Sequence, residues 1–192
     1  MHYYMFNKPF GCVCARRDDR WPTVLDYFRE LQNPDLSPVG RLDRETEGLL
    51  FLTDDGKWNQ QMTHPDHAKE KQYAFTAMGT LTEAQCRSLE SGILLTGSDR
   101  PTAPAKVEII DHSRLCEILP TLPDELQWRL SRNHPDQPVT FGNLTLTEGR
   151  KHQVRRMLRA VGCYVIALKR LSAGGIVLDP KLKPGQWKEF RP

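Results

Sequence analysis

Short runs rich in aromatic and β-branched residues recur along the 192-residue chain, and turn-forming residues close several of them. Such runs are typical of β-strands, and they cover residues 3–6, 49–53, 73–76, 107–110, 144–147, 164–168 and 187–190. Helical patterns are too few to alternate regularly with these strands. We therefore predict an α+β fold, with a largely antiparallel mixed sheet and a few flanking helices.

One helix is predicted more clearly than any other element of the sequence. Val154, Met157, Leu158 and Val161 follow the i, i+3, i+4, i+7 spacing of one apolar stripe, and Gly162 is a suitable terminator. The basic side chains of this segment fall on the opposite side of the predicted helix; they are His152, Arg155, Arg156 and Arg159.

Two further helices are predicted, together with one long loop. Thr82 and Gln85 have the spacing of a capping box, and Gly92 is a plausible end for that helix. Residues 23–28 are expected to open a short helix. Residues 120–138 are rich in Pro, Asp and Asn, which predicts an insertion or a long loop.

The charge of the chain is unevenly distributed. Residues 148–192 hold eleven of the 27 Lys and Arg residues but three of the 24 Asp and Glu residues. A basic end on a chain with a net charge of only +3 favours a polyanion-binding face, although a solvated basic surface would look the same.

Composition excludes several protein classes. Hydrophobic residues make up 39% of the chain, which is enough for a core, and no apolar run is long enough to span a bilayer. The start of the chain lacks the layout of a secretory signal, so we expect a cytoplasmic protein. The five cysteines are scattered, which argues against a disulfide framework, and Cys12 and Cys14 are expected to be small apolar residues of a strand.

The segment GRLDRETEGLLFLTDDG, residues 40–56, combines a charged loop with a buried strand. Asp43 therefore lies on an irregular segment held by rigid structure, where catalytic groups are often found. Taken alone, Asp43 could equally be a loop carboxylate paired with a neighbouring arginine.

Two other segments are candidates for function. EKQY, residues 70–73, stands at the head of a predicted strand, and EGRKHQVRRM, residues 148–157, joins a strand to the basic helix. A loop that enters a helix offers backbone N–H groups to phosphate. Each segment is a weak signal by itself.

In this order, the three segments closely resemble the pseudouridine synthases of the RsuA/RluE family, and the resemblance covers nearly the whole chain. Residues 7–11 look like the opening strand and turn of that family, and residues 168–176 resemble its closing motif. The chain has features of both RsuA-type and RluE-type members, so the target uridine and the ribosomal subunit stay open.

The resemblance implies roles for individual residues. Asp43 would be the nucleophile on a flipped-out uridine of ribosomal RNA, Tyr73 would face the base, and Arg155 would pair with Asp43. The expected RNA contacts are Arg41, Lys71, Arg150, Lys151, His152, Arg156 and Arg170. No cofactor, metal or obligatory protein partner is implied.

The resemblance also implies a domain organisation. We expect residues 1–192 to form a single catalytic domain, possibly as two packed halves, without the N-terminal S4 RNA-binding domain that many members carry.

Two alternatives of other classes remain. A non-catalytic RNA-binding module would keep the basic face without needing Asp43 and Tyr73. A metal-dependent hydrolase built on His64, Asp66 and His67 is disfavoured, because Pro65 disrupts a shared helical face.

Overall fold

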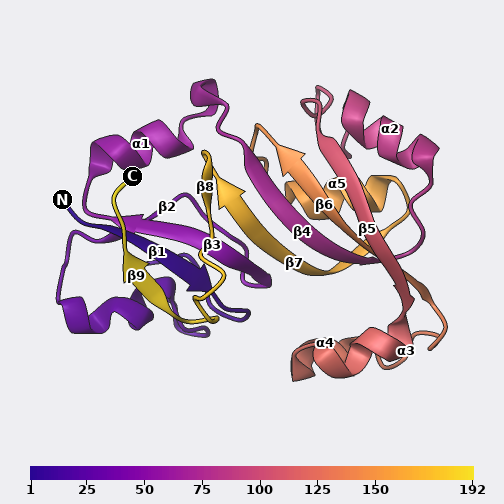
Figure 1. Cartoon of the computed structure of the whole chain (residues 1–192), viewed down its shortest axis with the longest axis horizontal. Helices are drawn as coiled ribbons and strands as arrows, with labels where there is room; N and C mark the ends of the chain where they lie inside the picture. The colour runs from indigo at the N-terminus through magenta and orange to yellow at the C-terminus, as the bar shows by residue number, and fades with distance from the viewer. The chain divides into compact units, whose positions relative to one another are not determined.

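The computed structural model describes all residues, 1–192, and the chain divides into two compact units. The first unit comprises residues 1–71 and 169–192, and the second comprises residues 72–168. The nine strands belong to a mixed, mostly antiparallel sheet, as predicted, and helices accompany the strands in both units (Figure 1). None of the helices combines the length and the apolar character that a membrane span requires.

The first unit contains a small sheet in the order β7-β3-β1-β9, with β2 beside β3 and β8 beside β7. Its strands are β1 (Tyr3–Lys8), β2 (Ser37–Val39), β3 (Thr46–Thr53), β8 (Ile176–Val177), β9 (Trp187–Glu189) and the end of β7 (Tyr164–Ala173). Its helices are α1 (Gly56–Thr63) and two 3₁₀ helices, η1 (Val24–Leu31) and η2 (Pro65–His67).

Strand β3 is the centre of the first unit. It pairs antiparallel with β1 from Tyr3↔Thr53 to Lys8↔Gly48 and with β2 on its other edge. Leu49, Leu50 and Leu52 are fully buried, which explains the continuous apolar run seen in the sequence. Burial of each such side chain stabilises the fold by about 1.5–3 kcal/mol.

The second unit has the strand order β5-β6-β4-β7. Its elements are β4 (Lys71–Met78), α2 (Glu83–Ser91), β5 (Lys106–Arg114), α3 (Leu115–Ile118), η3 (Leu119–Thr121), α4 (Asp124–Leu130), β6 (Pro138–Leu146), α5 (Gln153–Ala160) and the start of β7. Strands β5 and β6 pair antiparallel, with a register shift between Ile109 and Asp111.

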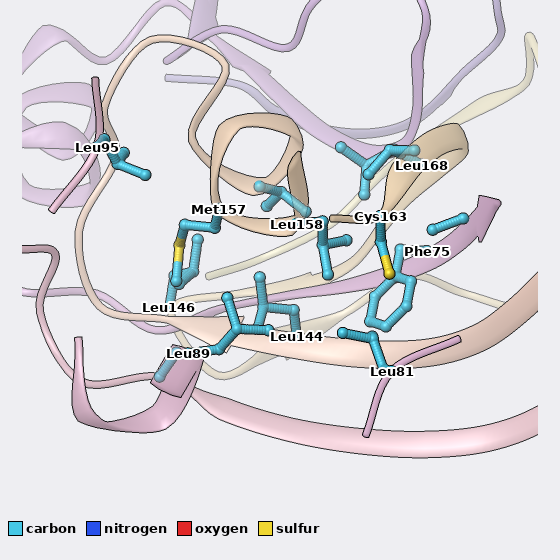
Figure 2. Close-up of a cluster of buried hydrophobic side chains, with 14 residues drawn as sticks. Phe75, Leu81, Leu89, Leu95, Leu144, Leu146, Met157, Leu158, Cys163 and Leu168 are labelled. Carbon is cyan, nitrogen blue, oxygen red and sulfur yellow. The ribbon is translucent and has the colours of Figure 1, made fainter. Parts of the chain in front are cut away.

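The predicted apolar stripe of α5 forms the core of the second unit. Met157 and Leu158 pack against Leu144 and Leu146 of β6, and Val154 is buried in the same cluster (Figure 2). Helix α5 ends at Ala160, and the terminator predicted at position 162 is confirmed by its left-handed φ of +84°.

The predicted capping box of α2 is confirmed. The Thr82 hydroxyl accepts a hydrogen bond from Gln85 N, and the Gln85 side chain accepts one from Thr82 N at 2.7 Å. The helix ends at Ser91, directly before Gly92, as expected.

The prediction of a long loop at residues 120–138 is wrong, because helix α4 occupies residues 124–130. Leu126 and Leu130 lie four residues apart and are both buried, which gives the segment an inward-facing side. Asp124 and Glu125 in the first turn stabilise the helix by interacting with its dipole.

Two smaller expectations also need correction. Cys12 and Cys14 do not lie in a strand; their segment makes one isolated bridge, between Val13 and Thr23. The helix expected at residues 23–28 is a 3₁₀ helix, η1, rather than an α-helix. All five cysteines are free thiols.

Candidate active site

Asp43 lies in the connection between β2 and β3 of the first unit. The connection begins at Gly40, which adopts a left-handed φ of +71°, and it is closed by a turn in which Thr46 N donates to Asp43 O at 3.0 Å. Leu42 is buried and anchors the segment, and the Leu42 amide donates to Cys14 Sγ at 3.3 Å. The backbone of Asp43 is therefore fixed from both sides, while its side chain is part-exposed.

The buried Lys8 side chain holds this connection through hydrogen bonds to its backbone. Its side chain is 0% exposed, and Nζ donates to the carbonyl oxygens of Thr46 at 2.9 Å and of Arg44 at 3.3 Å. Burial lowers the pKa of Lys8, and the nearby Cys12, Cys14, Glu47 and Asp43 side chains, in that order, partly oppose that effect. A buried cation thus ties down the two residues that flank the turn of Asp43.

Arg44 is held by aromatic rings. Its guanidinium lies 4.1 Å from the centroid of the Trp21 ring and 5.5 Å from that of Phe10, and it is 3.5 Å from the Glu45 carboxylate. Stacking of this kind stabilises a cation without removing its charge. The connection therefore carries a positive group immediately beside Asp43 in the chain.

Gly48 and Arg170 join the start of β3 to β7. A Cβ on Gly48, whose φ is +95°, would lie 2.3 Å from Arg170 O, so no other residue fits there without a backbone shift. Arg170 is only 4% exposed, and its Nε donates to Leu49 O at 2.7 Å. Its guanidinium is therefore held by a backbone carbonyl, and little of the side chain is accessible to RNA.

Tyr73 lies on β4 in the second unit. It is partly buried and packs against the cluster that contains Phe75 and Ala77, the next two residues on the same face of the strand. Its backbone position is therefore rigid, and part of the side chain remains accessible.

Arg155 lies on α5, off the apolar stripe, as predicted. Its Nη1 donates to Val165 O on β7 at 3.1 Å, which orients the side chain. Arg155 is part-exposed, whereas Arg159, one turn further along the helix, is exposed.

The loop before α5 is fastened by a polar cluster around Gln153, which is buried. Gln153 Nε2 donates to Glu148 Oε1 at 2.6 Å, and Gln153 Oε1 accepts from Arg150 N at 2.7 Å. The Glu148 carboxylate also accepts from Ala103 N at 3.0 Å. The loop is thus tied both to its own helix and to a distant segment.

Two of the arginines expected to contact phosphate are engaged with protein carbonyls. Arg150 donates to the carbonyls of Arg100 and Pro101, and Arg156 donates to Thr96 O at 2.7 Å and to Ser98 Oγ at 3.3 Å. Both guanidinium groups therefore hold the loop after α2, which limits how far they can serve as RNA contacts.

The remaining candidates for RNA contact differ in exposure. Arg41, Lys151 and His152 are exposed, and His152 adopts a left-handed φ of +52° at the start of α5. Lys71 is part-buried, and burial lowers its pKa. Its Nζ donates to Lys69 O at 2.9 Å.

Sequence reasoning missed three residues that position the candidate groups: Lys8, Glu148 and Gln153. All three stand inside segments that the sequence singles out, residues 7–11 and 148–157, but only their burial and hydrogen-bond partners reveal what they hold in place. No group of three or more His, Cys, Asp or Glu side chains is placed to hold a metal ion.

Comparison with known proteins agrees with this arrangement of fold and residues. The family model described as RNA pseudouridylate synthase matches residues 2–160. A solved structure of a pseudouridylate synthase superimposes with a TM-score of 0.79 at 38% identity, covering 99% of this chain and 70% of that one. A human RNA pseudouridylate synthase domain shares the fold, with a TM-score of 0.60 at 15% identity over 90% of this chain and 74% of that one.

Two curated relatives are similar to this chain in sequence. The ribosomal small subunit pseudouridine synthase A of Haemophilus influenzae is 38% identical over 97% of this chain and 68% of its own length. The enzyme of the same name from Escherichia coli K12 is 35% identical over 97% of this chain and 69% of its own length. The chain belongs to the RNA pseudouridine synthase family, whose members are isomerases, and it is close to the ribosomal small subunit pseudouridine synthases A. The alternatives of an RNA-binding module and of a metal-dependent hydrolase are set aside.

Proposed function

We propose that this enzyme isomerises one uridine of small-subunit ribosomal RNA to pseudouridine, with Asp43 as the nucleophile. The observation that carries the proposal is the Asp43 connection itself: a part-exposed carboxylate on a backbone fixed by buried Lys8 and by the turn to Thr46. The choice of RNA rests on the names of the relatives that resemble the chain over almost its whole length.

The chemistry suits a carboxylate. The N1–C1′ bond of uridine breaks, the base turns, and a C5–C1′ bond forms; C5 loses a proton and N1 gains one. Attack of an ionised Asp43 on C1′ splits this exchange into two easier displacements. No electrons enter or leave, so the balanced reaction needs no redox partner.

Tyr73 and Arg155 are proposed as the partners of Asp43 in this reaction. The ring of Tyr73, backed by the core of its unit, offers a face for the flipped base, and its hydroxyl can move a proton. The guanidinium of Arg155, oriented by Val165 O, provides the positive charge that favours an ionised carboxylate. Their assignment rests on the resemblance of residues 70–73 and 148–157 to the family's segments.

The proposed target is a uridine in structured RNA, and a stacked uridine must first be flipped out of its helix to reach Asp43. The exposed basic side chains that we propose for backbone contacts are Arg41, Lys151 and His152.

The test measures tritium released from [5-³H]uridine in a small-subunit RNA transcript, since the C5 proton leaves during isomerisation. Asp43→Asn should lower turnover at least about a thousandfold while RNA affinity stays within about twofold. The exposed Asp35→Asn is the matched control and should retain wild-type turnover. Comparing pseudouridine sites in ribosomal RNA from cells with and without the gene identifies the position, and an unchanged small-subunit map would refute the proposed target.

The same assay separates Arg155 from a general phosphate contact. Arg155→Ala should lose much more turnover than Arg159→Ala, which removes the same charge from an exposed position one turn away. Equal losses in the two variants would remove Arg155 from the reaction.

A further inference from the structure

A polar surface pocket of about 290 Å³ lies at the end of α1 and the start of η2. Its lining is entirely polar: Lys57, Gln60, Gln61, His64, Asp66 and His67. Pockets for drug-sized ligands start at about 300 Å³, so this one suits a ligand of the size of a nucleobase.

The partners of the two histidines define which ring nitrogens carry hydrogen in the neutral form. His64 Nδ1 accepts a hydrogen bond from Asp66 N at 3.3 Å, so the hydrogen of His64 is on Nε2. His67 Nδ1 lies 2.7 Å from Gln61 O, and a carbonyl can only accept, so His67 Nε2 has the lone pair. One ring therefore offers a donor and the other an acceptor, with centroids 5.6 Å apart.

The pocket belongs to the same part of the first unit as Asp43. Asn59 of α1 donates to Pro38 O on β2 at 3.2 Å, directly before the Asp43 connection. Thr63 Cγ2 lies 3.5 Å from where a Cβ on Gly40 would be, three residues before Asp43. Helix α1 is therefore packed through Asn59 and Thr63 beside the segment that carries the proposed nucleophile, and the α1 residues that line the pocket lie on a different face of the helix.

We propose that this pocket binds one unpaired nucleobase of the substrate RNA other than the reacting uridine; this inference rests on the proposed function. Paired donors and acceptors on the histidines and on two Gln amides match the edge of a base, which presents both kinds of group. A phosphate fits less well, because the Asp66 carboxylate, 87% exposed and 3.6 Å from His64 Nδ1, repels an anion. Lys57 is the one cation among the lining residues.

The chain supplies a matched control for a test of this pocket. His134-Pro135-Asp136 repeats His64-Pro65-Asp66, and Asp136 N donates to His134 Nδ1 at 3.2 Å, so the local geometry is the same. Both histidines are exposed, and replacing either with alanine leaves the core untouched. The repeat in the second unit has Gln137 where the pocket has His67.

The experiment measures binding of a small-subunit RNA transcript on the Asp43→Asn background, which prevents turnover. His64→Ala with His67→Ala should raise the Kd about three- to tenfold, the effect of losing one or two hydrogen bonds, whereas His134→Ala should leave it unchanged. The slope of log Kd against log salt should not change, because a base contact releases no counterions. With Asp43 present, kcat at saturating RNA should equal that of wild type.

Four outcomes would overturn the proposal: an unchanged Kd in the double variant, an equal rise in His134→Ala, a reduced salt slope, which indicates a phosphate contact, or wild-type affinity that falls with EDTA and returns with Zn²⁺. Failure of the proposed target is recognised separately. If wild type binds the transcript no more tightly than an unrelated RNA of equal length, the target is wrong, and the pocket is tested with the large-subunit transcript.

Discussion

The connection that carries Asp43 and the loop that precedes α5 are both charged, irregular segments, yet they are held in opposite ways. A buried cation, Lys8, binds the carbonyls around the acidic group of the first segment. An acid and an amide, Glu148 and Gln153, hold the basic second segment. A positive side chain holds the backbone around the acidic Asp43, and an acid and an amide hold the backbone of the basic loop. The charged side chains that stay exposed can then contact the substrate.

The two segments also differ in how closely other backbone approaches them. Gly48, in β3 directly after the first segment, faces Arg170 O, whereas nothing lies within 4 Å of a Cβ on Gly149 in the second segment. The first segment is therefore built into the sheet, and the second is fastened mainly by side chains. This difference predicts which substitutions damage the fold and which damage only RNA binding.

The largest effect is expected for Gly48→Ala. The new Cβ would meet Arg170 O at 2.3 Å, and the left-handed φ of +95° adds strain, so the free energy of unfolding should fall by about 3–5 kcal/mol. Gly149→Ala should change it by no more than about 1 kcal/mol. Urea unfolding of both variants measures the comparison, and equal losses would show that the two segments are equally constrained.

Lys8→Met should lower the free energy of unfolding less than Gly48→Ala does, but it should lower turnover. Losing Nζ removes its hydrogen bond to the Thr46 carbonyl and leaves Arg44 O with the donor Gly11 N, which costs about 1–3 kcal/mol and loosens the turn of Asp43. We expect turnover to fall about tenfold or more with little change in RNA affinity.

The pH dependence of stability checks the state of Lys8. Because burial lowers its pKa in the folded protein, the unfolded chain binds more protons between that lowered pKa and the ordinary value of 10.5. The free energy of unfolding should therefore rise with pH across this window, and this contribution should be missing from Lys8→Met. Identical pH profiles for the two proteins would contradict the buried charge.

Gln153→Leu is the equivalent change in the second segment. It removes the bonds to Glu148 and to Arg150 N, at a cost of about 1–3 kcal/mol in the free energy of unfolding. RNA affinity should fall while turnover at saturating RNA is nearly retained, the reverse of Lys8→Met. A larger effect on turnover than on affinity would show that this loop serves the reaction itself.

The smallest effect is expected for Lys151→Gln. This exposed residue should contribute one phosphate contact, so its loss should reduce the salt slope of RNA binding by about 1 without affecting stability. Arg150→Gln should lower the free energy of unfolding and leave the salt slope unchanged, because the Arg150 guanidinium binds the carbonyls of Arg100 and Pro101. Filter binding over a series of salt concentrations, together with urea unfolding, distinguishes the two.

Local sequence patterns were sufficient to predict the elements whose signal lies within a single helix or strand. The stripe of α5, the capping box of α2 and the apolar run of β3 are all confirmed. Helix α4 was missed because Pro, Asp and Asn dominate its surroundings, although Leu126 and Leu130 have helical spacing. Leu130 is buried in a cluster that includes Leu115 and Val139, and the local pattern does not reveal this contact.

The sequence by itself determined the α+β character of this protein, the family to which it belongs and the position of the candidate nucleophile. Only the tertiary structure decided what each basic residue does. Arg170 is buried against Leu49 O, 121 positions away, and Arg156 reaches Thr96 O across 60 positions. An arginine has the same charge wherever it stands in the chain; its role depends on which carbonyls the folded backbone places within hydrogen-bonding distance. Those partners are brought together by folding, not by spacing along the chain.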